Sequence, residues 1–390
     1  MKYTLPVYRK LPLSVKKAAG KFIWDESGRK YLDFFSGLSV NNFGHRPAEV
    51  VKAIKRQTDK YLHVSNLYTD ANQEKYARMI IKSSFPGKVF FSNSGGEANE
   101  LAIKLVRRAG SSSGRYRILS FKNSFHGRSM STLSATGQKK FHKGFRPLLA
   151  GFDYAVFNDI GSVKKKIGRK TAAVIVEPVQ GEGGVYPADK NFMGQLKKIC
   201  LKKNLILIFD EIQTGFGRTG VLFAFKHYGV KPDIMTLAKA AGGGLPLGIT
   251  VIGLKLEKHL PYGSHGSTFG GNPVSVAAGI ASFKMLTGRM LNKVKGLSSF
   301  LSAELEKIKN KYGVIKEVRM LGLMAGIEFT RPIADETAEY FFKKGVLINA
   351  CKSNIVRMMP PFIIDKKDIL RVADLLDCIL SDKYGKISKK

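Results

Sequence analysis

Lys239 is the residue whose surroundings most clearly allow chemistry. It follows the apolar segment DIMTLA at 233–238 and precedes the glycine-rich stretch AAGGGLPLG at 240–248. A partly buried lysine near a cationic ring loses proton affinity, so its amine can act as a nucleophile and then as a proton carrier. The glycines let the backbone pass close to a bound ligand. Lys239 is therefore the candidate catalytic residue, although any of 65 Lys and Arg residues could stand in such a place by chance.

Asp210 directly follows the apolar run LILIF at 205–209. A carboxylate at the end of a buried strand is costly unless it meets a cation. The protonated ring nitrogen of a cofactor would be such a cation. The structural alternative is an aspartate that caps the backbone of the following loop.

Ser94, Gly95 and Gly96 join the apolar segment KVFFS at 88–92 to a stretch of helical periodicity that opens with Glu97. Backbone N–H groups at the start of a helix, aided by the helix dipole, form a binding site for phosphate. A plain connection between a strand and a helix would account for the same residues equally well.

Phe125 and Arg128 lie together in SFHGR at 124–128. The phenyl ring offers a flat face for stacking, and the guanidinium offers a fork that binds a carboxylate. A core aromatic beside a surface arginine is the alternative interpretation of this pair.

Apolar runs alternate with stretches of helical periodicity, which is typical of an α/β fold with a mostly parallel central sheet. In such sheets ligands bind beyond the carboxyl ends of the strands, where the residues above are found. The expected strands lie at 88–92, 116–121, 172–178, 205–211, 233–238 and 248–253.

The chain is predicted to form two domains. The segment KFIWDESGRKYLDF at 21–34 predicts a hairpin with a turn at 26–29, and apolar segments after residue 285 predict a smaller α+β unit. Residues 1–55 and 285–390 would build the small domain, and residues 56–284 the large domain.

Composition limits the class of protein. The 390 residues carry a net charge of +35, scattered without a long basic block, so a basic surface is favoured over nucleic-acid binding. No apolar run suggests a membrane span or a secretory signal, which predicts a cytoplasmic protein. The three cysteines lack the spacing of a metal site or a disulfide framework, and no metal is expected.

Motifs along nearly the whole chain resemble one family, the class III aminotransferases of fold type I. The resemblance rests on EPVQGEGG at 177–184, DEIQTGFGRTG at 210–220, AKAAGGGLPLG at 238–248 and GSTFGGNP at 266–273. It implies pyridoxal 5'-phosphate as the cofactor and a homodimer that completes each active site from both subunits. Gly96 stands where Thr or Ala is commoner, and GHRPAEV at 44–50 is one residue shorter than the usual pattern.

The resemblance also assigns roles to individual residues. Lys239 would bind the cofactor covalently and carry the proton. Asp210 would pair with the ring nitrogen, Gln213 would approach the 3-oxygen of the ring, and Phe125 would stack on it. The residues implied around the cofactor are Ser94, Gly95, Gly96, Phe125, Asp210, Glu211, Ile212, Gln213, Lys239 and the partner's Thr268.

Four further residues would contact the substrates. Arg128 and Ser267 match positions that contact an acylated amino-acid substrate, and Arg357 matches the arginine that grips the α-carboxylate of 2-oxoglutarate. Glu182 would mask Arg357 when an amine enters the site.

The implied reaction transfers the terminal amine of N2-acetyl-L-ornithine to 2-oxoglutarate, a step of arginine biosynthesis. Ornithine, succinylornithine, 4-aminobutyrate or an acylated lysine-pathway amine are alternative donors. A racemase or aminomutase that uses the same cofactor shares nearly all of these motifs, and dependence on an added 2-oxo acid would separate it from a transaminase. The remote alternative is a nucleic-acid-binding protein on the same fold.

Overall fold

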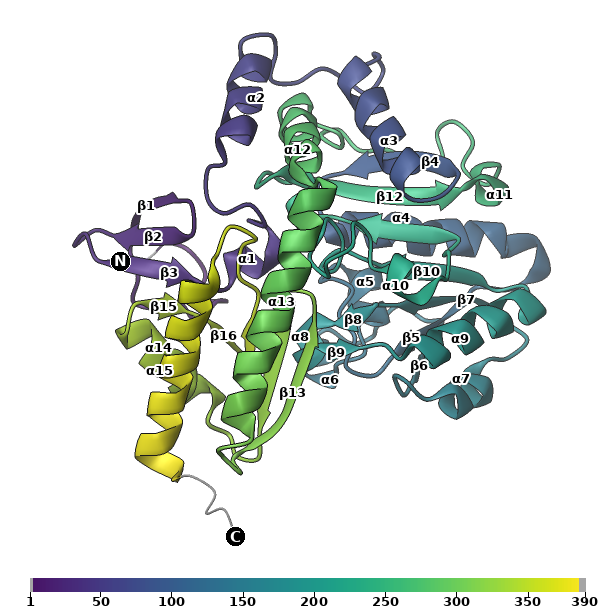
Figure 1. The fold of residues 1–390 in the computed structure, drawn as a ribbon. Helices are drawn as coiled ribbons and strands as arrows, with labels where there is room; N and C mark the ends of the chain where they lie inside the picture. Colours follow the sequence, from purple (N-terminus) through teal and green to yellow (C-terminus); the bar gives the residue numbers. More distant parts are fainter. Residues whose placement is uncertain (1–2, 386–390) are drawn as a thin grey trace.

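A seven-stranded sheet forms the centre of the protein in the computed structural model, which describes residues 3–385 (Figure 1). The strand order is β4-β12-β11-β10-β7-β5-β6, and only β12 runs antiparallel to its two neighbours. The strands are β4 (Gly87–Ser92), β5 (Arg117–Phe121), β6 (Phe152–Ala155), β7 (Thr171–Val176), β10 (Ile206–Asp210), β11 (Ile234–Leu237) and β12 (Gly248–Gly253). The expected α/β fold with a mostly parallel sheet is thus confirmed.

All six expected strands are present, and β6 is an addition to them. β6 escapes prediction because its sequence FDYA is short and three of its four residues are only partly buried. In the other strands, alternate side chains enter different cores, as the two-residue period of a strand requires. Leu207 and Phe209 of β10 join one core, whereas Ile208 joins the other, which α4 (Gly95–Ala109) covers with Leu101 and Leu105.

Both ends of the chain contribute to a second sheet. β1 (Val15–Ala19), β2 (Phe22–Asp25) and β3 (Lys30–Asp33) pair antiparallel in sequence order, so the expected hairpin is confirmed. β15 (Val346–Leu347) then pairs parallel with β3.

The third sheet, of order β13-β14-β17-β16, consists of β13 (Ile315–Leu321), β14 (Met324–Phe329), β16 (Asn349–Lys352) and β17 (Ile355–Met358). The long helices α13 (Gly288–Lys309) and α15 (Lys366–Tyr384) pack against each other on this part of the molecule (Figure 1). The domain boundaries expected at residues 55 and 284 stay a prediction.

Short elements connect these sheets. β8 (Val179–Gln180) and β9 (Tyr186–Pro187) pair with each other.

None of the helices within residues 3–385 is long and apolar enough to cross a membrane. The remaining helices are α1 (Ser36–Ser39), α2 (Ala48–Thr58), α3 (Ala71–Ser83), η1 (Ser111–Ser113), α5 (Met130–Ala135), α6 (Lys139–His142), α7 (Ile160–Lys166), α8 (Gly181–Gly184), α9 (Lys190–Lys203), α10 (Phe225–Tyr228), η2 (Lys239–Gly242), α11 (Leu254–Glu257), α12 (Pro273–Met285) and α14 (Ala334–Lys343).

The shortened GHRP segment is tied to the N-terminal sheet. Gly44 has a φ of +78°, and a Cβ there would lie 2.4 Å from the carbonyl oxygen of Gly20, so this position requires glycine. The backbones of Gly20 and His45 exchange hydrogen bonds of 2.9 and 2.7 Å, and His45 Nε2 lies 2.8 Å from Asp33 Oδ2. The deletion therefore leaves a well-bonded loop.

Candidate active site

Lys239 lies just beyond the carboxyl end of β11 and opens the short helix η2. Its φ of +52° places a residue other than glycine in the left-handed region, which costs about 1–2 kcal/mol. Burial lowers the pKa of its amine below the ordinary value, while Glu182 and Arg357 act on that pKa in opposite directions. The amine therefore loses its proton more readily than an exposed lysine would, as a nucleophile requires.

A cavity of about 370 Å³ opens beside Lys239 at the carboxyl ends of the central strands. Most of the site residues predicted from the sequence line it, although they come from segments that are far apart along the chain. Those residues are Ser94, Gly95, Gly96, Phe125, Glu182, Asp210, Ile212, Gln213 and Lys239.

The first turn of α4 forms one wall of the cavity. Ser94 caps this helix, and its Oγ accepts a hydrogen bond from the Glu97 N–H at 3.2 Å. A Cβ on Gly95 would lie 2.8 Å from Ile212 Cδ1, whereas a Cβ on Gly96 would meet only Ser94 Oγ at 3.7 Å. Gly95 is therefore needed for packing, and Gly96 occupies a place that would accept a side chain. The N–H groups of this turn suit a phosphate.

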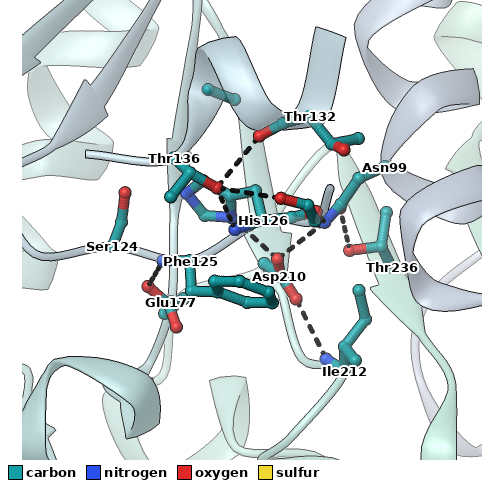
Figure 2. Close-up of polar contacts among 12 residues, drawn as sticks. Asn99, Ser124, Phe125, His126, Thr132, Thr136, Glu177, Asp210, Ile212 and Thr236 are labelled. Carbon is teal, nitrogen blue, oxygen red and sulfur yellow. Dashed lines mark hydrogen bonds and ion pairs between the residues drawn. The ribbon is translucent and has the colours of Figure 1, made fainter. Parts of the chain in front are cut away.

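Asp210 lines the cavity, and buried polar groups behind it hold its carboxylate (Figure 2). Its Oδ2 accepts hydrogen bonds from Asn99 Nδ2 at 2.8 Å and from His126 Nδ1 at 2.7 Å, and its Oδ1 accepts one from the Ile212 N–H at 3.1 Å. Thr236 Oγ1 in turn donates to Asn99 Oδ1 at 2.7 Å. These donors hold the Asp210 carboxylate in one fixed orientation, which suits a protonated ring nitrogen.

Sequence reasoning missed Asn99 and His126. Asn99 lies on the buried face of α4, and only its polarity among buried apolar neighbours could have suggested a role. His126 stands next to Phe125 in a segment that had already drawn attention, but its partner Asp210 is 84 positions away in the chain.

A hydrogen bond also links the backbone of Phe125 to the side chain of Glu177 (Figure 2). The Phe125 N–H donates to Glu177 Oε2 at 3.0 Å, and both residues line the cavity. Burial raises the pKa of Glu177 well above its ordinary value, and the negative charge of Asp210 adds to this effect. Glu177 belongs to the motif EPVQGEGG, but the sequence alone predicts no role for it.

Glu182, which is partly exposed, and buried Arg357 form an ion pair at the edge of the cavity. Glu182 Oε1 lies 2.6 Å from Arg357 Nη1 and accepts a weaker hydrogen bond from Gln213 Nε2 at 3.4 Å. Burial acts to raise the pKa of Glu182, but Arg357 outweighs it and holds that pKa at about 2. Arg357 Nη2 also donates to Asn349 Oδ1 at 3.0 Å, while its buried Nε has no partner within residues 3–385.

Glu211 points away from the cavity, although the sequence places it beside Asp210. Its carboxylate accepts hydrogen bonds from the backbone N–H groups of Ala224 at 2.5 Å and Phe225 at 2.7 Å. Burial raises the pKa of Glu211 to about 7 despite these bonds. Its side chain thus stabilises the start of α10.

Arg128, Ser267 and Thr268 do not line this cavity within one chain. The Arg128 guanidinium lies 3.9 Å from the ring centroid of Phe141, which packs edge-on against Phe125. Ser267 Oγ accepts a hydrogen bond of 3.2 Å from Asn93 Nδ2, and Asn93 does line the cavity. Thr268 is exposed on the neighbouring loop.

The residues of the cavity fit pyridoxal phosphate. Helix N–H groups suit the phosphate, the Phe125 ring suits a flat aromatic face, and Asp210 suits the ring nitrogen. Gln213 Oε1 is buried without a partner within residues 3–385, so Gln213 retains a polar group for a ligand. Lys239 supplies the amine to which an aldehyde can attach.

Comparisons with known proteins agree with this geometry. The model of the family "Aminotransferase class-III" matches residues 4–380. The chain is 45% identical to the acetylornithine aminotransferase of Caldanaerobacter subterraneus, over 98% of each chain. It is 44% identical to that of Methanocaldococcus jannaschii over 98% of this chain and 96% of the relative, and 40% identical to the succinylornithine transaminase of Yersinia pseudotuberculosis over 94% and 92%.

Solved structures share the fold. An ornithine aminotransferase from Toxoplasma gondii, described with partial occupancy of PLP at its active site, aligns with a TM-score of 0.92 at 27% identity, over 97% of this chain and 93% of that one. The N-acetylornithine aminotransferase of Stenotrophomonas maltophilia aligns with a TM-score of 0.84 at 32% identity, over 96% and 97%. The chain therefore belongs to the class III aminotransferases, a family of pyridoxal-phosphate-dependent enzymes.

Proposed function

We propose that the chain transfers the terminal amine of N2-acetyl-L-ornithine to 2-oxoglutarate, giving N-acetylglutamate semialdehyde and glutamate in arginine biosynthesis. The observation that carries this proposal is the Glu182–Arg357 ion pair of 2.6 Å beside Lys239. A transaminase of this type must accept an uncharged acylated chain ending in an amine, and then a dicarboxylate, in the same cavity. A cation that can be covered and uncovered meets both demands.

Arg357 binds the α-carboxylate of 2-oxoglutarate once Glu182 releases it. Arg357 is 1% exposed, so a carboxylate that reaches its guanidinium is shielded from water and forms a strong bidentate contact. When the amine donor enters, Glu182 keeps Arg357 neutralised. Arg128 and Ser267, at the cavity's rim, then contact the acylated amino-acid end of the donor.

The cofactor supplies an electron sink for the carbon that loses its proton. Ser94, Gly95 and Gly96 would hold its phosphate, the Phe125 ring would stack on its ring, and Asp210 would pair with the ring nitrogen. Gln213 would approach the ring's oxygen substituent. Lys239 would be the attachment point, and its Nζ would accept the proton from the amine-bearing carbon of the donor and return a proton to the acceptor carbon in the second half-reaction, because burial lowers the pKa of its amine.

A homodimer completes the site in this proposal. Thr268 reaches the cofactor phosphate of the partner subunit, since within its own chain it does not line the cavity. Large apolar side chains near this loop support an interface, because Leu67 is 91% exposed, Tyr262 108% and Phe269 59%.

A second donor, N2-succinylornithine, follows from the relative in Yersinia pseudotuberculosis, which is named for it. The two donors differ only in the acyl group, which would lie outside the catalytic constellation. Ornithine and 4-aminobutyrate lack an acyl group for Arg128 and Ser267 to recognise, whereas an acylated lysine-pathway amine, the other alternative, carries one.

Titration of the purified holoenzyme tests the proposal. The visible absorbance of the bound cofactor should fall on adding N2-acetylornithine and recover on adding 2-oxoglutarate, with glutamate formed in equal amount. Ornithine and 4-aminobutyrate at the same concentration should react far more slowly. A kcat/KM for ornithine equal to that for N2-acetylornithine would contradict the proposed donor, and turnover without any 2-oxo acid would contradict transamination.

A further inference from the structure

A second cavity, of about 750 Å³, lies between α6 and the turn that joins β16 to β17. Its walls come from three segments, at 122–123, at 137–154 and at 352–354. We call it the basic cavity, because five of its lining residues are cations and no carboxylate within residues 3–385 lines it. The cations are Lys122, Lys139, Lys140, Arg146 and Lys352.

The carboxylates near the basic cavity are already engaged. Asp153 lies 2.7 Å from Arg117 Nη2. Glu328 accepts from Arg319 at 2.6 Å and also from Lys316 and Tyr186, both at 2.8 Å. Among the residues that the structure describes, the five cations of the basic cavity make no ion pair, so their charge is left uncompensated there.

The crowding of positive charge is visible at Lys352, which is half-buried. Burial lowers the pKa of its amine, and the charges of Lys140 and Arg319 lower it further, against the opposite effects of Cys351 and Glu328. An anion placed among these groups would relieve the repulsion. Lys122, Lys139, Lys140 and Arg146 are exposed, like the lysines of α7, but they line the same cavity as half-buried Lys352.

The walls that carry these cations are held in place. Buried Gln138 donates through Nε2 to the carbonyl oxygens of Asn123 and Ser124, at 3.2 and 3.1 Å. His142, also buried, donates through Nε2 to the carbonyl oxygens of Leu133 and Thr136, at 3.1 and 2.7 Å. The cations thus stand on a frame that is ordered before any ligand binds, which reduces the entropy lost on binding.

We propose that the basic cavity binds a small anion that carries two or more negative charges on phosphate or carboxylate groups. Its volume lies within the range of small-molecule sites. Cations from three separate segments converge on it, so one multivalent ligand can contact several of them, whereas a monovalent ion would compensate a single charge. The site is distinct from the phosphate-binding turn of α4, which belongs to the cofactor, and the proposal does not depend on the identity of the amine donor.

Isothermal titration of the holoenzyme with inorganic pyrophosphate, and separately with citrate, tests the proposal. The holoenzyme is used because its cofactor already occupies the phosphate-binding turn. The test variant is Lys140→Gln/Lys352→Gln, which keeps the length of both side chains and removes two charges. The matched control is Lys164→Gln/Lys165→Gln, which removes two exposed charges from α7. All three proteins should retain the same melting temperature and transaminase kcat.

The wild type and the control should bind at least one of the two anions at one site per chain, and the test variant should bind it about tenfold or more weakly. A preference for pyrophosphate or for citrate identifies the physiological ligand as phosphate- or carboxylate-bearing. The proposal is overturned if neither anion binds saturably to the wild type. It is also overturned if the test variant binds the anion as tightly as the wild type. The same holds if the test and control variants lose affinity by the same factor, because the net positive charge of the whole chain, and not a defined site, would then attract the anion.

Discussion

Replacing Asn99 with leucine tests whether the polar groups behind Asp210 hold the cofactor. Asn99 Nδ2 donates to Asp210 Oδ2 and to the His126 carbonyl oxygen, both at 2.8 Å, and its Oδ1 accepts from Thr236 Oγ1 at 2.7 Å. Leucine has the same branched shape and the same number of heavy atoms as asparagine but removes all three bonds. A lost hydrogen bond to a charged group costs about 1.5–3 kcal/mol. If that loss falls on the ion pair between Asp210 and the ring nitrogen, the Kd for the cofactor rises roughly 10- to 150-fold.

The assay is a titration of the apoenzyme with pyridoxal phosphate, followed by visible absorbance, together with a measurement of kcat at saturating cofactor. Thr236→Val removes only the donor to Asn99 Oδ1, so it should weaken cofactor binding by less than Asn99→Leu. Asn191→Leu is the control, because Asn191 is exposed on α9. Its Kd and kcat should match those of the wild type.

A different result would refute the reasoning. If Asn99→Leu lowers the melting temperature but leaves the cofactor Kd within about twofold of the wild type, the network serves the packing of α4 against the sheet and not Asp210. Thr236→Val guards against misreading a folding defect, since valine has the shape of threonine and removes a single neutral hydrogen bond, worth about 1 kcal/mol.

Three other changes have clear expected outcomes. Lys239→Ala should abolish turnover and the visible absorbance of the bound cofactor while leaving the melting temperature of the apoenzyme nearly unchanged, as spectroscopy and calorimetry can show. Glu182→Gln should flatten the dependence of stability on pH in acid, because Arg357 holds the pKa of Glu182 at about 2, against burial and below the ordinary 4.5. The ion pair contributes about 3 kcal/mol to the free energy of unfolding. This contribution is complete above pH 4.5 and is lost as the pH falls toward 2. Denaturant titrations at several pH values measure it. Gly95→Ala should weaken cofactor binding far more than Gly96→Ala, because the Cβ at position 95 would clash with Ile212 Cδ1 at 2.8 Å, whereas the Cβ at position 96 would make only an ordinary contact with Ser94 Oγ at 3.7 Å. Equal losses of affinity would contradict the geometry.

The strand ends were predictable because short, mainly apolar runs that alternate with stretches of helical periodicity are typical of buried strands in an α/β chain. Lys239, Asp210 and the Ser94–Gly96 turn each follow such a run, and parallel strands bring their ends together. β6 lacked that signal, since FDYA is only four residues long and mixed in polarity.

The support around the site was not predictable, because it depends on contacts between distant segments. Asn99 and Asp210 are separated by 111 positions, and nothing in the helical pattern of α4 marks Asn99 as a partner of a strand end. Glu211, in contrast, is next to Asp210 in the sequence but does not line the cavity. Its neighbour Asp210 points into the cavity, and successive side chains at a strand end point to opposite sides, so Glu211 bonds to the α10 backbone instead.

The geometry around Glu182 indicates where the free energy for switching between substrates comes from. Its contact with Gln213 Nε2 is long, at 3.4 Å, so the cost of moving Glu182 lies chiefly in the 2.6 Å ion pair with Arg357. Breaking that pair without replacement would leave a buried guanidinium unpaired, which costs about 3–5 kcal/mol. In the proposed reaction, the carboxylate of 2-oxoglutarate would supply the replacement, whereas an amine could not. Release of Glu182 would therefore be favourable only when the dicarboxylate is present, and the same cavity would select each substrate in its turn.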